Sequence, residues 1–358
     1  MESVVIDPEF WSGRRVFLTG HTGFKGSWLA LWLSDMGAEV HGYALEPPSQ
    51  PNLFEISRVE SCLASHTIGN IVDGSCLETA MRQANPSVVL HLAAQPLVRY
   101  SYSAPVETFE VNVMGTVNVL QAARAVLGVE AVVNVTTDKC YLNREWLWPY
   151  RENEAMGGHD PYSASKACAE IVTAAYRTSF CADGHPWIAS ARAGNVIGGG
   201  DWASDRIVPD ALRAIDSSEM LVLRSPGAIR PWQHVLEPLA GYLALAQRLV
   251  CDGHPFAEAW NFGPHETDAR SVSWIVEYLA KLDGSLRWTL SGSEKFHEAG
   301  LLKLDSSRAR TLLSWEPRWS LSKALEATLE WHREWRAGTD MSAVCREQIA
   351  TYLETVSS

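Results

Sequence analysis

The sequence predicts an α/β protein with a doubly wound parallel sheet and a smaller mixed α/β lobe at the carboxyl end. Short β-branched runs alternate with longer segments of helical spacing through the first half of the chain. Repeated strand–helix–strand units place helices on both faces of a parallel sheet. After about Arg192 the loops become richer in glycine and proline. We therefore expect residues 11–192 to form the sheet domain, to which some later segments return, and residues 193–353 to form mainly the smaller lobe.

The strands of this sheet are predicted from short β-branched runs, which are typical of buried strands. Four such runs occur in the first half of the chain, namely Val16–Thr19, Glu39–Tyr43, Val88–Leu92 and Ala131–Val135.

The segments between these runs carry apolar residues at the spacing of one helix face. In the predicted helix Val111–Leu127, this face includes Leu120, Ala123 and Leu127. Other segments with helical spacing are Ser27–Met36, Val235–Val250 and Ser271–Leu282. We expect burial for the tryptophans on the helices, including Trp28, Trp32, Trp274 and Trp331.

Composition excludes several classes of function. The chain has 42 acidic and 30 basic residues and a net charge of −12, so we expect no nucleic-acid or membrane partner, although a local basic pocket for a phosphorylated small molecule is allowed. The amino terminus has no signal-peptide pattern and no apolar run approaches membrane-spanning length. The seven cysteines are scattered, and no His, Cys or Asp cluster has metal-ligand spacing. These features favour a reduced, cytoplasmic protein without a metal site.

A glycine-rich turn follows the first predicted strand. Gly20, Gly23 and Gly26 are spaced GxxGxxG and lead directly into an amphipathic helix. Gly20 permits a sharp turn, Gly23 lets the backbone approach a pyrophosphate, and Gly26 lets the helix lie close to the strand. A strand, a turn and a helix in this order predict a dinucleotide site. Its predicted contacts in the turn are Gly20, Thr22, Gly23, Phe24 and Lys25.

The second strand lacks the acid that usually binds the adenosine ribose at its end. Glu46 stands further along, and no arginine is present to favour a 2′-phosphate, so NAD is preferred over NADP. Asp73 and Gly74 follow a predicted third strand and fit either an adenine contact or a helix N-cap. The small residues after the fourth strand fit either a cofactor surface or a tightly packed sheet edge; they are Leu92, Ala93 and Ala94.

Two motifs carry the predicted chemistry. Tyr162 and Lys166 lie four residues apart, so on a helix they share one face. A cation near a phenol lowers the phenol's pKa, which would make Tyr162 a general base for a sugar hydroxyl. Thr137, Asp138 and Lys139 follow the fifth strand, at the sheet edge where open parallel sheets bind ligands. The alternatives are an exposed helix face and a solvated ion pair.

These motifs resemble the extended short-chain dehydrogenase/reductase family that modifies nucleotide sugars. The resemblance extends from about Trp11 to Leu353 and is more specific in the second half, because epimerases and reductases share the other motifs. Within the family, Thr137–Lys139 and Gly198–Asp210 resemble the dehydratases that act on CDP-glucose. The missing ribose acid departs from the family pattern. The resemblance implies a Rossmann fold, a bound NAD, further cofactor contacts at Asn112 and Thr136, and a nucleotide-sugar-binding smaller lobe.

The resemblance also implies a hydro-lyase mechanism that converts CDP-glucose to CDP-4-dehydro-6-deoxy-D-glucose. Tyr162 takes the proton of the 4-hydroxyl while the C4 hydride passes to NAD, Thr137 hydrogen-bonds O4, and Lys166 tunes Tyr162. Lys139 then removes the C5 proton, and Asp138 protonates the departing C6 hydroxyl.

These roles require particular protonation states. Lys139 must be neutral, which burial and the Lys166 cation would favour, and Asp138 must keep its proton. The relatives acting on dTDP-glucose have Glu at the position of Lys139, which favours the CDP-sugar branch.

The substrate diphosphate requires cations, and bidentate arginine suits phosphate oxygens. Arg206 and Arg230 are the first candidates, with Arg213 and Arg224 as further ones. The remaining predicted substrate contacts are Gln95, Val98, Asn195, Asp201, Gln233 and His234, of which Asn195 also fits an Asx turn and His234 also fits a structural role.

Alternative functions are another nucleoside-diphosphate-glucose dehydratase, a nucleotide-sugar 4-epimerase, and a silent NAD-binding scaffold. An epimerase has no need for the Asp138–Lys139 pair, and a scaffold has no need for Tyr162 and Lys166. The resemblance further implies a homodimer or homotetramer formed through the helices at 111–127 and 162–176. It also implies a role in deoxysugar synthesis for a lipopolysaccharide O-antigen.

Overall fold

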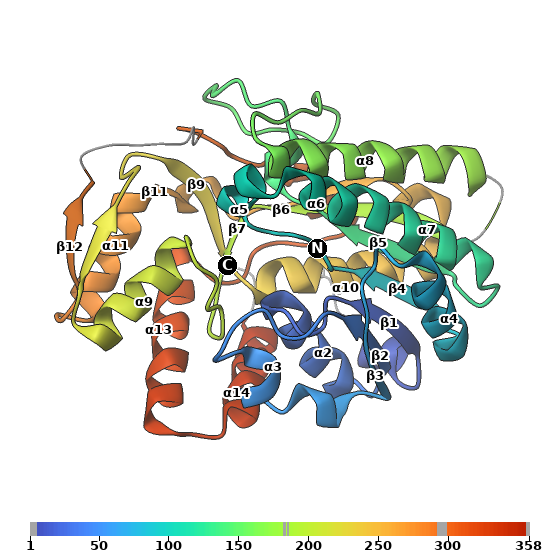
Figure 1. The fold of residues 1–358 in the computed structure, drawn as a ribbon, viewed down its shortest axis with the longest axis horizontal. Coiled ribbons are helices and arrows are strands. Elements are labelled where there is room, and N and C mark those ends of the chain that lie inside the picture. Colours follow the sequence, from blue (N-terminus) through green and yellow to red (C-terminus); the bar gives the residue numbers. More distant parts are fainter. Residues whose placement is uncertain (1–5, 182–183, 185, 292–298, 356–358) are drawn as a thin grey trace.

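The computed structural model describes residues 6–181, 184, 186–291 and 299–355. Its centre is a seven-stranded sheet in which every neighbouring pair of strands is parallel (Figure 1). The strand order is β10-β6-β5-β4-β1-β2-β3. The strands are β1 Arg15–Thr19, β2 Glu39–Ala44, β3 Ser65–Ile68, β4 Val88–His91, β5 Ala131–Val135, β6 Trp187–Ala193 and β10 Ala259–Phe262. This order reverses direction between β1 and β4, so the crevice at that point opens at the carboxyl ends of the strands.

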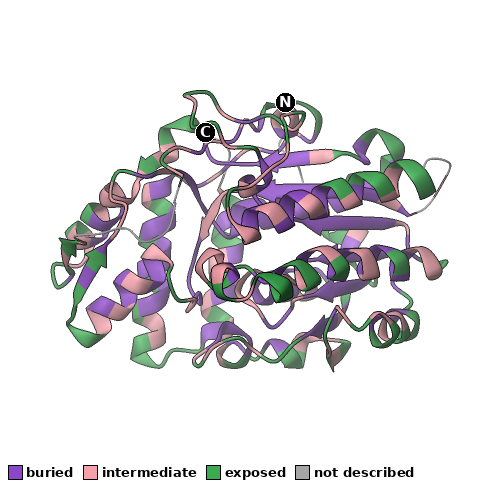
Figure 2. Ribbon diagram, turned by 45° about the horizontal axis from the view of Figure 1, so that its top comes forward, coloured by how far each residue is buried: buried purple, intermediate pink, exposed green. Residues whose placement is uncertain are grey.

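Helices cover both faces of the sheet, as the sequence predicts (Figure 1). One face packs against α2 (Phe24–Asp35) and α10 (Leu236–Asp252), with α14 (Met341–Glu354) outside them. The other face packs against α4 (Gly74–Ala84) and α7 (Gly115–Ala125), and α8 (Pro161–Phe180) lies beside α7. The inner faces of these helices are buried and the outer faces are exposed (Figure 2). The central strands β4 and β5 are buried at every position because helices exclude water from both sides.

The carboxyl-terminal part of the chain adds two small sheets beside the large one. One has the order β11-β9-β7 and the other pairs β12 with β8. Their strands are β7 Asn195–Ile197, β8 Met220–Leu223, β9 Ile229–His234, β11 Ala269–Ser271 and β12 Arg287–Leu290. A separate apolar core joins them to α9 (Ile207–Ser217), α11 (Val272–Leu282) and α13 (Leu321–Ala337). Because β10 and α10 follow residue 193 yet pack in the large sheet's layers, the chain crosses between the two parts more than once; the boundary at residue 192 stays a prediction.

Short helical segments connect these layers. The α-helical ones are α1 Pro8–Trp11, α3 Leu53–Ile56, α5 Val98–Ser103, α6 Pro105–Phe109 and α12 Ser307–Leu312. The 3-10 segments are η1 Val59–Cys62, η3 Asp138–Cys140, η4 His254–Phe256 and η5 Glu266–Asp268, and η2 Glu110–Met114 is a π-helical segment leading into α7.

Two expectations about burial are wrong. Leu127 is fully exposed because α7 ends at Ala125 and Val126 is already extended, so Leu127 does not belong to the helix face. Trp274 is half-buried and stacks on Tyr278 at 5.1 Å between ring centroids. The other three helical tryptophans are buried as expected.

In the part of the chain that the structure describes, every helix is too short or too polar to cross a bilayer.

Candidate active site

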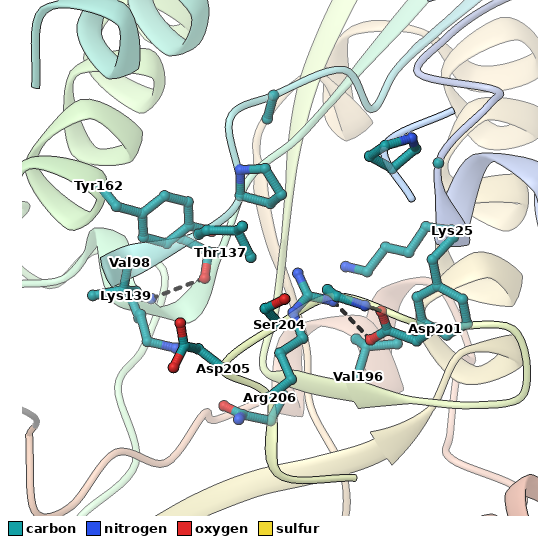
Figure 3. A pocket seen from close by; sticks show the side chains of 18 of the residues that line it. Lys25, Val98, Thr137, Lys139, Tyr162, Val196, Asp201, Ser204, Asp205 and Arg206 are labelled. Carbon is teal, nitrogen blue, oxygen red and sulfur yellow. Dashed lines mark hydrogen bonds and ion pairs between the residues drawn. The ribbon is translucent and has the colours of Figure 1, made fainter. Parts of the chain in front are cut away.

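A cavity of about 790 Å³ opens at the carboxyl ends of the central strands. Its wall combines the glycine turn after β1, the ends of β4 and β5, the start of α8, and segments of the carboxyl-terminal part. Figure 3 shows Lys25 and the Asp201–Arg206 ion pair on one side of the cavity, with Tyr162, Thr137 and Lys139 on the other. The structure therefore brings together residues that the sequence separates by more than a hundred positions.

The glycine turn is packed so that backbone faces the cavity. Gly20 has a φ of +79°, and a Cβ on it would lie 2.7 Å from the backbone nitrogen of Ala93. A Cβ on Gly26 would lie 2.1 Å from the carbonyl oxygen of Gly20, so α2 can approach β1 only with glycine there. Gly23 precedes α2 and lines the cavity, together with Thr22, Phe24 and Lys25. The first N–H groups of α2 therefore face the cavity, where a pyrophosphate can bind them.

The end of β2 lacks a ribose acid because Ala44 stands there. A Cβ on Gly42 would lie 2.6 Å from the His21 ring, which fills the space beside this strand. Glu46 lines the cavity two residues beyond the strand end. Asp73 caps α4 by accepting a hydrogen bond from the Cys76 backbone at 3.0 Å. Of the two alternatives for Asp73 and the adjacent Gly74, the structure contains the N-cap, and neither residue lines the cavity.

The small residues after β4 do line the cavity; they are Leu92, Ala93 and Ala94. Asn112 does not, because its side chain ties three segments together behind the wall. Its Oδ1 accepts a hydrogen bond from the Gln95 backbone at 2.9 Å, and its Nδ2 donates to the Gln95 carbonyl and to the Ser165 hydroxyl. The Gln95 side chain donates to Thr108 and is also outside the cavity. Val98 lines it.

Tyr162 and Lys166 lie on one buried face at the start of α8, and both line the cavity. Asp160 fixes this start by accepting a hydrogen bond from the Ser163 backbone at 2.9 Å. The Lys166 ammonium donates to the Val135 carbonyl at 3.4 Å. Burial lowers the pKa of Lys166 to about 8, and the nearby Glu170 carboxylate acts in the opposite direction.

The expectation that a cation holds the pKa of Tyr162 below its ordinary value is wrong for this structure. Burial raises the pKa of Tyr162 to about 12. A hydrogen bond with the Thr137 side chain and the charge of Arg206 lower it, but by less than burial raises it. The prediction considered the cation and left out the cost of placing a phenolate away from water.

The three residues after β5 form a tight turn. The Thr137 hydroxyl donates to Oδ1 of Asp138 at 3.0 Å and accepts from the Lys139 backbone at 3.3 Å. Thr137 and Lys139 line the cavity, as does Thr136, whereas Asp138 is buried beneath the turn. The other carboxylate oxygen of Asp138, Oδ2, has no hydrogen-bond partner among the described residues.

Burial lowers the pKa of Lys139, which is the direction that the sequence analysis expected. The Asp138 carboxylate opposes this effect, and Arg230 and Arg206 add to it. These arginines therefore take the part that the sequence analysis assigned to Lys166.

A buried polar network behind the site was missed. Glu170 forms an ion pair with Arg192 at 2.7 Å, and both side chains are at most 5% exposed. Glu170 also accepts hydrogen bonds from the Thr136 and Ser190 hydroxyls. It lies four residues after Lys166 on α8, so helical spacing was an available signal for its position.

The cavity is cationic although the chain is acidic. Among the described lining residues, seven are lysine or arginine and five are aspartate or glutamate. Burial, together with the charges of Arg206 and Lys166, lowers the pKa of the Lys25 ammonium to about 7. Arg206 forms an ion pair with Asp201 at 2.9 Å. Arg224, Arg230 and Asn195 also line the cavity.

Besides Gln95, three predicted substrate contacts lie outside the cavity lining. Arg213 donates to the carbonyl oxygens of Trp202 and Ala203. Gln233 is buried and donates to the Phe262 carbonyl at 2.7 Å. His234 is fully buried between the rings of Trp28 and Trp319, and burial lowers its pKa to about 3. The structural alternative for His234 is therefore the one that the packing supports.

Arg99 on α5 and Asp205 before α9 are among the lining residues that were not predicted, and they form an ion pair. They are far apart in sequence, and Asp205 lies within the Gly198–Asp210 segment without having been singled out there.

Comparison with known proteins gives a consistent assignment. A family model described as GDP-mannose 4,6 dehydratase matches residues 17–328. The chain is 51% identical to a CDP-glucose 4,6-dehydratase of Salmonella typhimurium, over 99% of this chain and 100% of the relative. It is 26% identical to GDP-mannose 4,6 dehydratase 2 of Caenorhabditis elegans, over 84% of each chain.

Among solved structures, MoeE5 in complex with UDP-glucuronic acid and NAD matches with a TM-score of 0.76 and 25% identity, over 89% of this chain and 99% of that chain. The epimerase Mth375 of Methanothermobacter thermautotrophicus shares the fold, with a TM-score of 0.80 and 24% identity over 93% and 96% of the two chains. The extent of the family match and the identity to a full-length relative lead to one conclusion: the chain belongs to the GDP-mannose 4,6 dehydratase family.

Proposed function

We propose that this protein is a CDP-glucose 4,6-dehydratase, a hydro-lyase that uses NAD catalytically and releases CDP-4-dehydro-6-deoxy-D-glucose. The observation that carries the proposal is the placement of Lys139, Thr137 and Tyr162 at one end of a single cavity, with Asp138 buried directly beneath them and hydrogen-bonded to Thr137. A base and an acid at this position suit elimination across C5 and C6. The match of residues 17–328 to the 4,6-dehydratase family model and the 51% identity to a CDP-glucose enzyme support the same choice.

The residues present fit NAD at the other end of the cavity. The packing of Gly20 and Gly26 leaves the amino terminus of α2 open to a pyrophosphate, and Lys25 supplies a cation there. Among the described residues that line the adenosine end after β2, Glu46 is the charged one and none is lysine or arginine, which favours NAD over NADP. NAD bound here would supply the acceptor for the C4 hydride of the sugar and the donor that restores it at C6.

Oxidation at C4 requires removal of the 4-hydroxyl proton. Tyr162 takes this proton, and Thr137 holds O4 by a hydrogen bond, which positions the sugar beside the phenol. The raised pKa of Tyr162 means that bound ligands must stabilise the phenolate for this step, and Arg206 and Lys166 are the protein cations in the cavity that assist. We infer that Lys166 also holds the nicotinamide ribose.

Elimination follows because a C4 carbonyl makes the C5 proton acidic. Lys139 removes that proton, and the burial that lowers its pKa increases its neutral fraction at working pH. Asp138 delivers a proton to the C6 hydroxyl as it leaves as water, and C5 is reprotonated when hydride reaches C6. Oδ2 of Asp138 is buried and has no hydrogen-bond partner among the described residues, so the turn that covers this oxygen must shift for it to reach the sugar.

The charge of the cavity suits a nucleotide sugar. Arg206 and Arg230 flank the turn that carries Lys139, and Arg224 lies beyond them on the cavity wall. A substrate diphosphate brings negative charges that the guanidinium groups of Arg206 and Arg230 can neutralise by bidentate hydrogen bonds. Asn195 adds an amide on the same wall. An acidic chain with a cationic cavity selects a small anion while repelling polyanions.

The proposal also includes an assembly and a cellular role. Exposed apolar side chains gather on α6, η2 and α8, where Val106, Phe109, Met114 and Ile171 are 38% to 70% exposed. We propose that a second copy of the chain covers them in a homo-oligomer, as the resemblance implies. We also propose a cytoplasmic location, which the scattered cysteines favour, and a role in O-antigen deoxysugar synthesis, which the resemblance implies.

The test is turnover of CDP-, dTDP- and UDP-glucose, each deuterated at C4, with NAD present. The expected result is conversion of CDP-glucose to a 4-keto-6-deoxy product with deuterium in the new methyl group. A galactose isomer would establish an epimerase, product without label would exclude hydride return, and no turnover would support a scaffold. Preference for dTDP- or UDP-glucose would overturn the base assignment alone.

A further inference from the structure

The segment 201–206, which leads from β7 to α9, crosses the cavity and lines it at every position. Its beginning is anchored in the core. The Gly199 carbonyl accepts a hydrogen bond from the Trp28 indole at 2.9 Å, and the Trp202 ring packs on Trp331 and Trp335 at 5.8 and 5.1 Å between centroids. The buried Asp201 carboxylate accepts hydrogen bonds from the Ala203 backbone and from Arg206. This half of the segment is therefore fixed.

The other half is held by charges at the cavity wall. Asp205 has a left-handed φ of 61° and contacts Arg224 at 2.7 Å and Arg99 at 3.4 Å. Arg99 lies on α5, after the sheet strand β4, whereas Arg224 follows β8 in the carboxyl-terminal part. One carboxylate thus joins three segments that surround the cavity, and all three residues line it. Figure 3 shows Asp205 on the stretch of chain that leads to Arg206.

The two contacts of Asp205 are suited to reversible opening. The side chains of Arg99, Arg224 and Asp205 are 29%, 31% and 43% exposed, so water can replace either partner. Each ion pair with this exposure contributes little to the free energy that holds the segment in place. By contrast, the Asp201 carboxylate is 6% exposed, and its pair with Arg206 keeps its place. Opening of the segment should therefore begin at Asp205 and stop at Asp201.

We propose that Asp205 is a positioning residue that latches segment 201–206 over a bound nucleotide sugar, and that its bridge to Arg99 and Arg224 sets how fast the nucleotide sugar dissociates. The inference rests on the proposed function, because it takes the ligand to be a nucleoside diphosphate sugar. Closure excludes water from the cavity and keeps the oxidised sugar from leaving. Asp205 makes and breaks no covalent bond in this role.

A competing role for the same contacts has the opposite sign. If Asp205 occupied arginines that otherwise bind the substrate diphosphate, it would compete with the ligand. Removing its charge would then tighten binding, whereas removing a latch weakens binding. The sign of the change in affinity therefore separates the two roles.

The experiment compares the NAD-loaded wild-type protein with Asp205→Asn, an isosteric change that removes the charge. The probe is CDP, whose dissociation rate is measured by stopped-flow displacement and whose Kd is measured by calorimetry. Loss of two partly exposed ion pairs should raise the dissociation rate of CDP roughly 3- to 30-fold, and the Kd for CDP should also increase. The Kd for NAD should not change. An unchanged or lower Kd for CDP would overturn the proposal.

The matched control is Asp340→Asn. Asp340 forms one exposed ion pair with Arg58 at 3.0 Å, far from the cavity lining, and asparagine preserves its role as the N-cap of α14. This variant should bind CDP as the wild type does. If Asp340→Asn weakens CDP binding as much as Asp205→Asn does, a general effect of removing one negative charge explains the result, and the latch is overturned.

Two further measurements test the latch itself. Amide hydrogen exchange at residues 203–206 should accelerate in Asp205→Asn and stay unchanged in Asp340→Asn. Arg99→Gln should weaken CDP binding in the wild-type background and have no further effect in Asp205→Asn, because the two changes break the same contact. Additive effects would mean that Arg99 binds the ligand directly and would overturn the latch. If the wild-type protein does not bind CDP, the proposed function fails first.

Discussion

The pKa of Lys25 makes NAD affinity a function of pH. This pKa is lowered to about 7 by burial, which is the largest cause, and by the cations Arg206 and Lys166, while Asp138 and Asp201 act in the opposite direction. A pyrophosphate at the amino terminus of α2 would bring negative charge beside the ammonium and raise the pKa, so binding takes up a proton. The affinity for NAD should therefore be highest below pH 7 and should fall as the pH rises above 7.

The magnitude follows from this value. With a pKa of about 7, Lys25 is about nine-tenths protonated at pH 6 and about one-tenth protonated at pH 8. If NAD binds the ammonium form, its Kd should rise about tenfold between these two pH values. The assay is quenching of tryptophan fluorescence by NAD at fixed ionic strength, because it does not depend on turnover.

Two variants isolate the contribution of Lys25. Lys25→Met should bind NAD weakly at both pH values, without the tenfold change. Lys25→Arg keeps a cation that does not titrate in this range, so its Kd should stay nearly constant. A tenfold change that persists in Lys25→Met would assign the titration to another group, and a constant Kd in the wild type would refute the reasoning.

Three other outcomes are expected. Lys139→Met should still oxidise C4, seen as transient nicotinamide absorbance, but should form dehydrated product at least about 100-fold more slowly; full turnover would remove Lys139 as the base. Tyr162→Phe should abolish that transient absorbance, and an unchanged oxidation rate would exclude Tyr162. Burial raises the pKa of Glu237 to about 7 in the folded protein. Between about pH 4.5 and 7 the unfolded chain therefore ionises this carboxyl while the folded protein keeps it protonated, and the free energy of unfolding falls. The free energy of unfolding of Glu237→Gln, relative to that of the wild type, should therefore be roughly 2–3 kcal/mol larger at pH 8 than at pH 5, as measured by urea unfolding. An equal difference at the two pH values would contradict this.

The large sheet and the cofactor turn could be predicted from sequence because their signals are local. An apolar run marks a strand buried on both faces, and the spacing of Gly20, Gly23 and Gly26 reports contacts made within one strand–turn–helix unit. Tyr162 and Lys166 share a face because helical geometry alone places them there. The end of α7 was predicted less well, since apolar residues continue past the last helical turn.

The cavity wall was harder to predict because it depends on which way neighbouring side chains point. On β9, Arg230 and Trp232 line the cavity, while Gln233 on the other face of the strand bonds the Phe262 backbone. Resemblance of a segment to a known family locates the strand, but it does not say which of the strand's side chains point into the cavity. The Arg99–Asp205–Arg224 bridge had no local signal at all, because its members lie on three separate segments.

Protonation states were the least predictable property, because desolvation depends on the complete fold. Burial is the largest cause that raises the pKa of Tyr162 and lowers the pKa of Lys25 and Lys139, in each case by disfavouring the charged form. The ligands then separate the two lysines. A pyrophosphate beside Lys25 restores its charge and makes it a binding residue, whereas the uncharged sugar ring leaves Lys139 beside Arg206 and keeps it available as a base. One physical effect, the exclusion of water from this cavity, thus produces both a cationic anchor and a neutral amine.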